Sequence, residues 1–532
     1  MVQVFAAFAI VVASIATLSV HAHAQEPPMK IASPANMTRV GSINERYQSY
    51  NIEMLEVTGG MFWKPYGSAS SGQTSGAPDR SGVPAGMDPN LYEYRPPVDL
   101  SNRKLRRLAA ALGPAYVRVS GTWANTMYFA DAEPAPSSPP SGFNSVLSRE
   151  RWKGVVDFAA ATDTRIVTSM AISPGVRDAD GVWTPGQARE FLDYTRSVGG
   201  DIAAAEFMNE PTMATMGGAP KGYDAAAFGR DFKLFASFAR QVASGMRILG
   251  PGAVGETTAS DAMIRYGSQA TVATRDMLQQ MGKEIDAFSY HHYGAASRRC
   301  AGTPGMPQTS ADAALSEEWL ARTDQTLAFY RNLRDEFEPG KPMWVTETAD
   351  AACGGNPWAS TFLDTFRYLD QLGRLAKQGV QVVIHNTLAA SDYGLLDQKT
   401  LKPRPNYWGA LLWRRLMGTT VLDSGVEIAE GQHVYAHCLH GAPGGVTLLV
   451  INNSRTETAV DTPLESKRYT LSAEPLQNGG VELNGAALKL DDSGDLPAIE
   501  GAATAAGSVS FAPGTITFLA IERSGNSACR GS

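Results

Sequence analysis

The stretch IAAAEFMNEP, residues 202–211, contains the pattern that decides the fold. Its first seven residues, Ile202–Met208, form a short and almost wholly apolar run, and Asn209, Glu210 and Pro211 follow directly. A run of this length and composition is typical of a strand that is buried on both faces. Similar runs recur on both sides of it, and longer helical patterns stand between them. This alternation predicts a parallel sheet with crossover helices.

The alternation extends from about residue 51 to residue 418. The predicted strands are Asn51–Val57, Ala115–Ser120, Arg165–Ile172, Ile202–Met208, Arg247–Gly250, Ile285–His291, Pro342–Thr346 and Val380–Asn386. The predicted helices lie within 101–113 and at Glu150–Thr162, Pro185–Val198, Asp224–Ser244, Glu317–Glu338, Ala359–Lys377 and Asn406–Met417. Eight strands with helices between them predict a (β/α)8 barrel over residues 51–418.

The sequence before and after the predicted barrel has a different pattern. After Gly418 the helical periodicity disappears, and short β-rich runs separated by Gly, Asn, Asp and Pro predict a C-terminal antiparallel β-sandwich over residues 419–532. Residues 25–50 could contribute a strand to this sandwich. Two stretches that follow strand ends, Lys64–Pro97 and Asp131–Phe143, are predicted as loops on the catalytic face of the barrel.

The N-terminus predicts export. Val4–Val20 is almost wholly apolar, and Ala22-His23-Ala24 fits a small-x-small cleavage site. We therefore expect a signal peptide over residues 1–24 and a periplasmic or secreted protein. The alternative is an uncleaved membrane anchor. No later apolar run reaches the roughly 18 residues that a membrane span needs.

Composition excludes several classes of function. The 532-residue chain carries a net charge of −7, which argues against nucleic acid and other polyanions as partners. Its four cysteines are Cys300, Cys353, Cys438 and Cys529, an even number that permits two disulfides in an exported protein. The chain has no CxxC motif and no Cys/His cluster with ligand spacing, which argues against a structural zinc site. The sequence implies no metal and no organic cofactor.

Two acidic residues stand at predicted strand ends. Glu210 follows the fourth strand, and Glu347 follows the seventh in the string Trp344–Thr348. In a barrel the strand C-termini meet on one face, so the two carboxylates become neighbours. Cleavage of a glycosidic bond needs such a pair, and a separation of about 5–5.5 Å gives retention of configuration. Asn209 is expected to bind the sugar hydroxyl beside the anomeric carbon. The alternative is that each Glu is a solvated charge.

Several strings carry a resemblance to a known family. They are Lys104–Leu108 with Gly113–Arg118 and Gly121-Thr122, then Tyr290–Tyr293, then Ser391–Tyr393 with Leu396-Asp397 and Asn406–Trp408. From about residue 45 to its end, the chain resembles glycoside hydrolase family 79, the heparanase and β-glucuronidase family. The resemblance implies that Glu210 is the general acid/base and Glu347 the nucleophile.

The same resemblance implies further site residues. Tyr293 would hydrogen-bond Glu347, and Glu53 would bind distal hydroxyls of the terminal sugar. The carboxylate of a uronic acid would be held by backbone N–H groups around Gly354 and Gly355 and by Tyr393. Cys353 stands where the heparanase pattern has a glycine, a departure that leaves the donors of this loop open.

Other assignments are less specific. Thr122 and Asn125, after the second strand, are expected to line the pocket. His291 and His292 must point to opposite faces of a strand, so one lines the site and the other packs, with His292 as the candidate for substrate binding. The resemblance pairs Cys438 with Cys529. A bridge between Cys300 and Cys353 across the rim of the site is then open.

Together these features predict a retaining hydrolase that cleaves β-glucuronides in glycans or glycoconjugates. Whether it acts on chain ends or within chains is open. Two alternatives remain: a retaining glucosidase, xylosidase or arabinofuranosidase, and a glycan-binding protein without activity. The expected partner is a carbohydrate with a β-linked uronic acid.

Overall fold

A computed structural model describes residues 29–30, 33–67, 88–257, 272–301, 308–426, 428 and 430–531. The predicted signal peptide, residues 1–24, lies outside these ranges, as does most of the stretch Lys64–Pro97. Within the described ranges, no helix is both long enough and apolar enough to cross a membrane.

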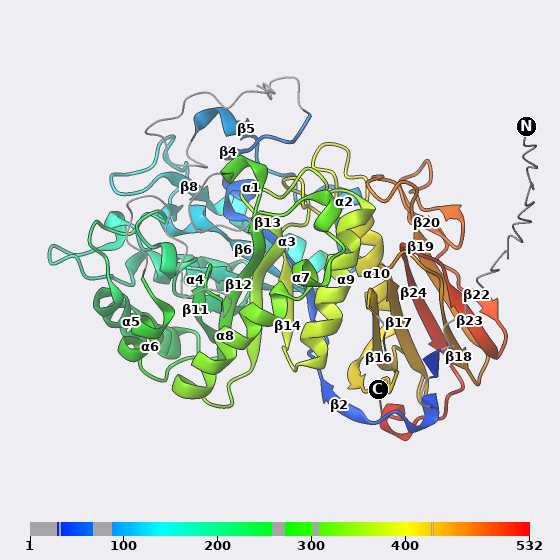
Figure 1. The fold of residues 1–532 in the computed structure, drawn as a ribbon. Helices are drawn as coiled ribbons and strands as arrows, with labels where there is room; N and C mark the ends of the chain where they lie inside the picture. Colours follow the sequence, from blue (N-terminus) through cyan, green and yellow to red (C-terminus); the bar gives the residue numbers. More distant parts are fainter. Residues whose placement is uncertain are drawn as a thin grey trace, which may run out of the picture.

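Eight parallel strands close into a barrel (Figure 1). They are β3 (Gln48–Glu53), β6 (Ala115–Ser120), β9 (Thr164–Ser169), β10 (Ile202–Glu206), β11 (Arg247–Ala253), β12 (Ala287–Ala296), β13 (Met343–Ala352) and β14 (Val382–His385). The last strand closes the barrel by pairing with the first, with Ile384 opposite Ser49. The predicted fold class, a (β/α)8 barrel followed by an antiparallel β-sandwich, is confirmed.

Helices cover the outside of the barrel. They are α2 (Arg103–Ala110), α3 (Arg149–Ala161), α4 (Gly186–Ser197), α5 (Ala225–Val242), α6 (Thr274–Met281), α7 (Glu317–Leu320), α8 (Arg322–Phe337), α9 (Phe362–Lys377) and α10 (Pro405–Leu416). The sequence did not predict α6, a helix of two turns whose buried apolar side chains are only Met277, Leu278 and Met281. The helix predicted at 317–338 is divided at Ala321.

The first strand differs most from its prediction. It was expected at Asn51–Val57, but β3 ends at Glu53 and helix α1 (Met54–Thr58) continues the chain. The turn is stabilised because the backbone N–H of Glu53 donates to the carboxylate of Glu56 at 2.8 Å. The apolar residues Met54, Leu55 and Val57 are therefore buried from a helix rather than from a strand.

The C-terminal unit is a sandwich of two sheets. The larger sheet contains β2 (Arg39–Ser42), β15 (Met417–Leu422), β16 (Gln432–Leu439), β17 (Val446–Asn452), β24 (Thr515–Ile521), β19 (Ser466–Ser472), β20 (Glu482–Leu483), β21 (Ala486–Ala487) and β22 (Ala502–Thr504). The smaller sheet contains β1 (Met29–Lys30), β18 (Thr458–Thr462) and β23 (Gly507–Phe511). Both sheets thus include one strand from before the barrel.

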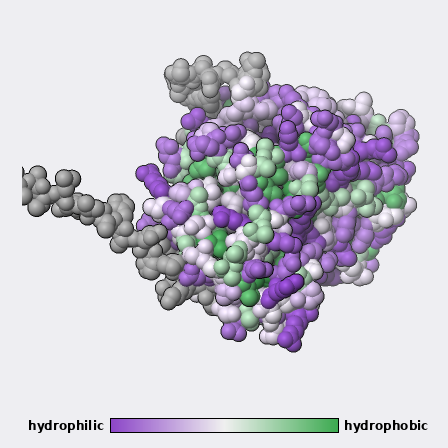
Figure 2. Space-filling model, turned by 90° about the vertical axis from the view of Figure 1, so that its right-hand side faces the viewer, coloured by the Kyte–Doolittle hydropathy of each residue, from purple (hydrophilic) through white to green (hydrophobic). Residues whose placement is uncertain are grey.

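Apolar side chains between these sheets form a separate core that includes Leu448 on β17 and Phe511 on β23, and the disulfide Cys438–Cys529 joins β16 to the C-terminal segment. Hydrophilic residues dominate the outer face at this end of the molecule, with hydrophobic residues in small groups (Figure 2). The sandwich contacts the barrel through α9, where the Tyr435 hydroxyl donates to Asp370 at 2.5 Å.

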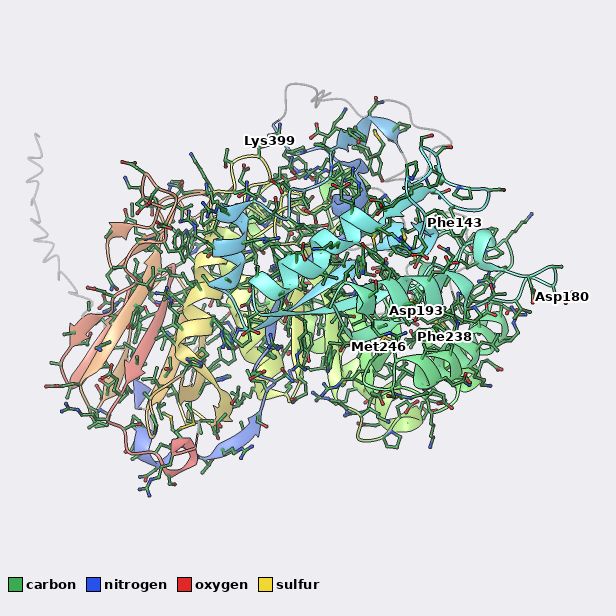
Figure 3. All side chains as sticks on the ribbon, turned by 180° about the vertical axis from the view of Figure 1, so that it is seen from behind. Phe143, Asp180, Asp193, Phe238, Met246 and Lys399 are labelled. Atoms are coloured by element: carbon green, nitrogen blue, oxygen red, sulfur yellow. A yellow bond between two sulfur atoms is a disulfide. The ribbon has the colours of Figure 1, made fainter. Side chains whose placement is uncertain are left out.

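Two small two-stranded sheets lie at the C-terminal ends of the barrel strands. Strands β4 (Gly60–Trp63) and β5 (Tyr92–Arg95) are antiparallel, so the stretch Lys64–Pro97 is only in part the predicted loop. Strands β7 (Met127–Ala130) and β8 (Ser145–Ser148) are parallel and flank residues 131–143. In Figure 3, Phe143 lies on the upper side of the barrel, above Met246, which directly precedes β11.

Candidate active site

Two carboxylates meet at the C-terminal side of the barrel, as their strand positions require. Glu210 follows β10, and Glu347 lies on β13. One oxygen of each carboxylate and one ring nitrogen of His291 all lie within 4.8 Å of one another. This spacing is close to the ~5–5.5 Å of retaining glycosidases and shorter than the ~6.5–9.5 Å of inverting ones.

The two carboxylates differ in their exposure. The side chain of Glu210 is 19% exposed, and that of Glu347 is 8% exposed. Glu210 also has a left-handed backbone with φ of 49°, which is rare for a residue with a side chain and is held at a cost in conformational energy. The more open carboxylate is the better placed of the two to exchange a proton with water.

Glu347 is held by two donors, one to each oxygen. Arg118 Nη1 donates to Oε2 at 2.8 Å, and the Tyr293 hydroxyl donates to Oε1 at 2.5 Å. These bonds fix the rotamer of the carboxylate, and Arg118 supplies a counter-charge. Burial, followed by the negative charge of Glu347, raises the pKa of Tyr293 well above its usual value, so its hydroxyl remains a donor.

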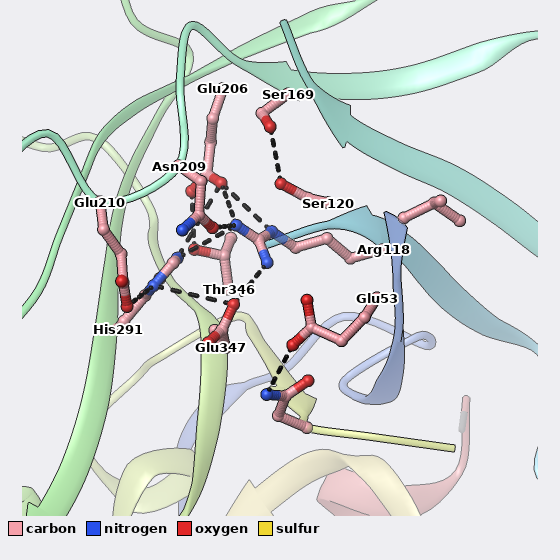
Figure 4. A network of polar contacts seen from close by, with 12 residues as sticks. Glu53, Arg118, Ser120, Ser169, Glu206, Asn209, Glu210, His291, Thr346 and Glu347 are labelled. Carbon is pink, nitrogen blue, oxygen red and sulfur yellow. Dashed lines mark hydrogen bonds and ion pairs between the residues drawn. The ribbon is translucent and has the colours of Figure 1, made fainter. Parts of the chain in front are cut away.

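Arg118 connects the polar side chains at the base of the site (Figure 4). Its Nη2 donates at 2.8 Å to Glu206 and to the side-chain oxygen of Asn209. Burial by itself would lower the pKa of Arg118, but the charges of Glu206 and Glu347 outweigh it and hold the pKa above its ordinary value. The guanidinium is therefore a permanent cation beneath the two carboxylates.

Glu206 lies below the pair and does not face the cavity. Its Oε1 accepts a hydrogen bond from Thr346 at 2.7 Å, while Oε2 pairs with Arg118. Burial would raise the pKa of Glu206, but the positive charge of Arg118 outweighs this effect and lowers it. Glu206 therefore acts as a fixed anion that positions Arg118.

His291 connects to the acid/base candidate. Its Nε2 lies 3.2 Å from Arg118 Nη2, and its Nδ1 lies 3.0 Å from Glu210 Oε1. A guanidinium can only donate, so this contact assigns the ring proton to Nδ1, which donates to Glu210. The same Nδ1 is 3.9 Å from Glu347 Oε2.

Among the described residues, Glu210, His291 and Glu347 are the trio whose ligand atoms are close enough to hold a metal ion. Both oxygens of Glu347 already accept hydrogen bonds, however, and one of the donors is a guanidinium. A divalent cation would have to displace these donors and lie beside Arg118. The donor set fits two working carboxylates better than a metal centre.

A cavity of about 280 Å³ opens above the pair. Of the residues predicted from sequence, those that line it are Glu53, Thr122, Asn209, Glu210, Tyr293, Glu347 and Tyr393. Aromatic residues close its sides: Phe62, Trp63, Tyr92 and Trp123. Among the described residues, no Lys or Arg side chain lines this cavity.

Asn386 organises one wall of the cavity and was not predicted. Its side-chain nitrogen lies 3.0 Å from Glu53 Oε1, 3.0 Å from the Tyr293 hydroxyl and 3.2 Å from the Tyr393 hydroxyl. Burial, and then repulsion from Glu347, raises the pKa of Glu53 well above its usual value. This wall therefore presents protonated or hydrogen-bonded oxygens to a ligand.

Gly121 is required for this arrangement. Its φ is 90°, and a Cβ at this position would lie 1.7 Å from Glu53 Oε2. Any larger residue would push Glu53 out of its place beside Asn386.

Four predicted site residues do not line the cavity: Asn125, His292, Gly354 and Gly355. Asn125 is fully buried and grips the backbone of Asn209, because its Nδ2 donates to the Asn209 carbonyl and its Oδ1 accepts from the Asn209 N–H, both at 2.9 Å. The prediction for His292 was wrong. Its ring points away from the site and lies 2.9 Å from the Thr326 hydroxyl on α8. The cavity side of β12 carries His291 and Tyr293 instead.

The glycine loop lies directly behind the wall. Cys353, Gly354 and Gly355 all have positive φ, at 62°, 78° and 84°. Cys353 lines the cavity, whereas Gly354 and Gly355 lie beneath Trp63 and Tyr393. A disulfide joins Cys353 to Cys300 at the rim.

Comparisons with known proteins point to one family. A family model described as "Glycosyl hydrolase family 79, N-terminal domain" matches residues 97–373. Heparanase from Mus musculus is 27% identical over 496 residues, which cover 81% of this chain and 88% of that protein. Baicalin-beta-D-glucuronidase from Scutellaria baicalensis is 25% identical over 446 residues, which cover 76% and 79%.

Solved structures show the fold. An alpha-L-arabinofuranosidase from Thermotoga maritima aligns with a TM-score of 0.62 at 14% identity, over 93% of this chain and 99% of that one. A 4-O-alpha-L-rhamnosyl-beta-D-glucuronidase from Fusarium oxysporum aligns with a TM-score of 0.58 at 12% identity, over 92% and 100%. The family model and the relatives together show that this chain belongs to glycosyl hydrolase family 79 and is a glycoside hydrolase.

Proposed function

We propose that the protein is a retaining β-glucuronidase with Glu210 as general acid/base and Glu347 as nucleophile. The observation that carries this proposal is the fixed position of Glu347, which Arg118 and Tyr293 hold within 4.8 Å of a carboxylate oxygen of Glu210. A nucleophile needs such fixation to meet the anomeric carbon in line.

The reaction runs in two displacements. In the first, Glu347 attacks the anomeric carbon, the glycosidic C–O bond breaks, and Glu210 gives its proton to the leaving oxygen. In the second, ionised Glu210 takes a proton from water, the hydroxide attacks the same carbon, and the ester bond to Glu347 breaks. The sugar leaves with its configuration retained, and Glu210 is protonated again.

Recognition of a uronic acid rests on Tyr393 and the loop at Cys353. Burial, and then the charge of Glu53, raises the pKa of Tyr393 well above its usual value, so its hydroxyl is available to donate. Backbone N–H groups in a run of left-handed residues can bind an anion without a basic side chain. The names of the relatives, a heparanase and a glucuronidase, support the same substrate class.

The test compares p-nitrophenyl β-glucuronide with the β-glucoside. We expect strong turnover of the glucuronide that disappears in Glu347→Ala. In Glu210→Ala, the aryl substrate should lose much less rate in the first step than an alkyl glucuronide, because p-nitrophenolate needs little protonation. Preference for the glucoside would contradict the uronate assignment, and binding without turnover would indicate a glycan-binding protein.

We also propose export from the cell. Two disulfides, Cys300–Cys353 and Cys438–Cys529, are typical of proteins from oxidising compartments. Sequencing the N-terminus of the protein from its native host should give Gln25 as the first residue. An intact Met1 in the cell-associated protein would favour the membrane anchor.

A further inference from the structure

A single buried arginine joins the loops around the cavity. Arg299 follows β12 and is 7% exposed. Its Nη1 donates to three successive carbonyls, those of Cys353 (3.3 Å), Gly354 (3.0 Å) and Gly355 (3.1 Å). Its Nη2 donates to Asp392 at 2.5 Å and to the Lys64 carbonyl. One guanidinium thereby connects segments that follow four different barrel strands.

The β4–β5 hairpin is held down by this arginine. The Arg299 guanidinium lies 3.8 Å from the ring centroid of Tyr66, which closely follows β4. The Trp63 indole stacks on Tyr92 with centroids 4.5 Å apart, and both rings line the cavity. A Cβ on Gly354 would be 2.8 Å from Trp63, so the indole packs on the glycine loop with no space between them.

The hairpin therefore covers the side of the cavity that carries the Cys353 loop. In a glucuronate the carboxyl group is attached to C5, beside the C4 hydroxyl, where a preceding sugar of a chain can be attached. Of the proposed carboxylate donors, the Cys353 loop is the one against which the hairpin packs, through Trp63 and Gly354. The cavity at this place, about 280 Å³, is slightly smaller than the ~300–1,000 Å³ of small-molecule sites.

The orientation of the loop follows from the same contacts. The C=O and N–H of a trans peptide point in opposite directions. Three carbonyls that converge on Arg299 therefore turn the N–H groups of the same peptides, those of Gly354, Gly355 and Asn356, away from it. The Asn356 N–H donates to Asp350 at 2.9 Å.

We propose that the enzyme is exo-acting, and that Arg299 is the positioning residue that makes it so. By clamping the β4–β5 hairpin onto the loop at Gly354, Arg299 closes the pocket beyond the terminal glucuronate. This inference rests on the proposed β-glucuronidase activity, and it names the substrate as a chain end or a single glucuronide rather than the interior of a polymer.

A matched pair of chromogenic substrates tests the exo proposal. One is p-nitrophenyl β-glucuronide, and the other is the same glucuronide with one further sugar on its C4 oxygen. We expect the wild-type enzyme to cleave the extended substrate at least ~100-fold more slowly, because the added ring meets a packed wall. Similar rates on both would overturn the exo proposal and leave the β-glucuronidase activity standing. Cleavage of neither, with turnover of another β-glycoside, would overturn both.

Arg299→Lys tests the role of the arginine, with Arg298→Lys as the matched control. A lysine keeps the charge but cannot bridge three carbonyls and an aspartate. We expect the KM for the short glucuronide to rise ~10-fold or more, kcat to change less, and the preference for the short over the extended substrate to shrink. Arg298 is exposed on the neighbouring position, and its substitution should change none of these.

A purely structural role for Arg299 would lower stability without changing the ratio of the two rates, and that result would overturn the assignment. Should Arg299→Lys fail to fold, Trp63→Ala removes the wall without leaving a buried charge. It should raise the rate on the extended substrate relative to the short one. An unchanged ratio in Trp63→Ala would contradict the proposed closure.

Discussion

The molecule contains two networks of ion pairs, each centred on one arginine; one is buried, and the other is partly exposed. One lies beneath the cavity and joins Arg118 to Glu206 and Glu347. The other lies between the barrel and the sandwich, where Arg374 on α9 pairs with Asp370, Asp324 and Glu317. The first network leaves carboxylate oxygens facing an open cavity, whereas in the second Tyr435 from β16 covers Asp370. A buried ion network indicates function only where it faces space for a ligand.

The largest expected effect is on activity, when one carboxylate of each network is replaced by an amide. Glu347→Gln keeps the shape of the side chain but removes the proposed nucleophile, and kcat/KM for p-nitrophenyl β-glucuronide should fall by about 10⁵-fold or more. The matched change in the second network, Glu317→Gln, should leave kcat/KM within about 2-fold. Comparable losses in both variants would remove the distinction between the networks.

Substitution of the central arginine of each network should have different effects on stability and activity. Arg118→Met leaves Glu206 buried without its cation, so the free energy of unfolding should fall by about 3–5 kcal/mol and activity should be lost. Arg374→Met should also destabilise the protein, by a smaller amount since the Glu317 partner is half exposed, but the folded fraction should keep its kcat. Urea denaturation and active-site titration measure the two quantities. Loss of kcat in correctly folded Arg374→Met would show that the contact between barrel and sandwich contributes to catalysis.

The two adjacent histidines allow the same comparison on one strand. His291→Gln removes a hydrogen bond to the Glu210 carboxylate and should lower kcat by about 10–100-fold. His292→Gln loses only a contact with Thr326 on the outer helix, so its kcat should remain and its stability should decrease modestly. A loss of kcat in His292→Gln with an unchanged melting temperature would contradict the orientation of β12.

The smallest expected effect concerns pH. Burial raises the pKa of Glu56 to about 7, although the backbone N–H of Glu53 and the charge of Arg95 oppose the shift. Because this folded pKa lies above the unfolded value of about 4.3, the folded chain binds a proton that the unfolded chain has released. The contribution of Glu56 to stability is therefore complete below about pH 4.3 and declines as the pH rises through the folded pKa.

Glu56→Gln should accordingly gain about 1–3 kcal/mol relative to the wild type between about pH 5 and pH 8. Urea denaturation at both pH values measures the difference. An equal difference at the two pH values would show that Glu56 has an ordinary pKa.

The sequence predicted the charges that follow apolar runs and missed the charges within them. Glu210 and Glu347 stand where the apolar runs stop, so the barrel rule places them together. Arg118 and Glu206 were missed although each is a charge inside an apolar run, because only the closed barrel shows that they face each other. A charged residue within a predicted buried strand was the signal available for both.

The error at His292 was avoidable from the sequence alone. Side chains alternate along a strand, and Tyr293 had already been assigned to the site. That assignment places His291, two positions earlier, on the same face and His292 on the other. Asn386 and Arg299 offered no such signal, since their partners come from segments far apart in sequence, such as Glu53 and Lys64.

The most direct test of the account is to trap the covalent intermediate. A 2-deoxy-2-fluoro-glucuronyl fluoride slows both displacements but loses its good leaving group in the first, so the enzyme should accumulate as a glycosyl ester. Peptide mapping by mass spectrometry should place the added mass on Glu347, and none should form in Glu347→Gln. Label on another carboxylate, or hydrolysis with inverted configuration and no label, would contradict the assignment of Glu347 as the nucleophile.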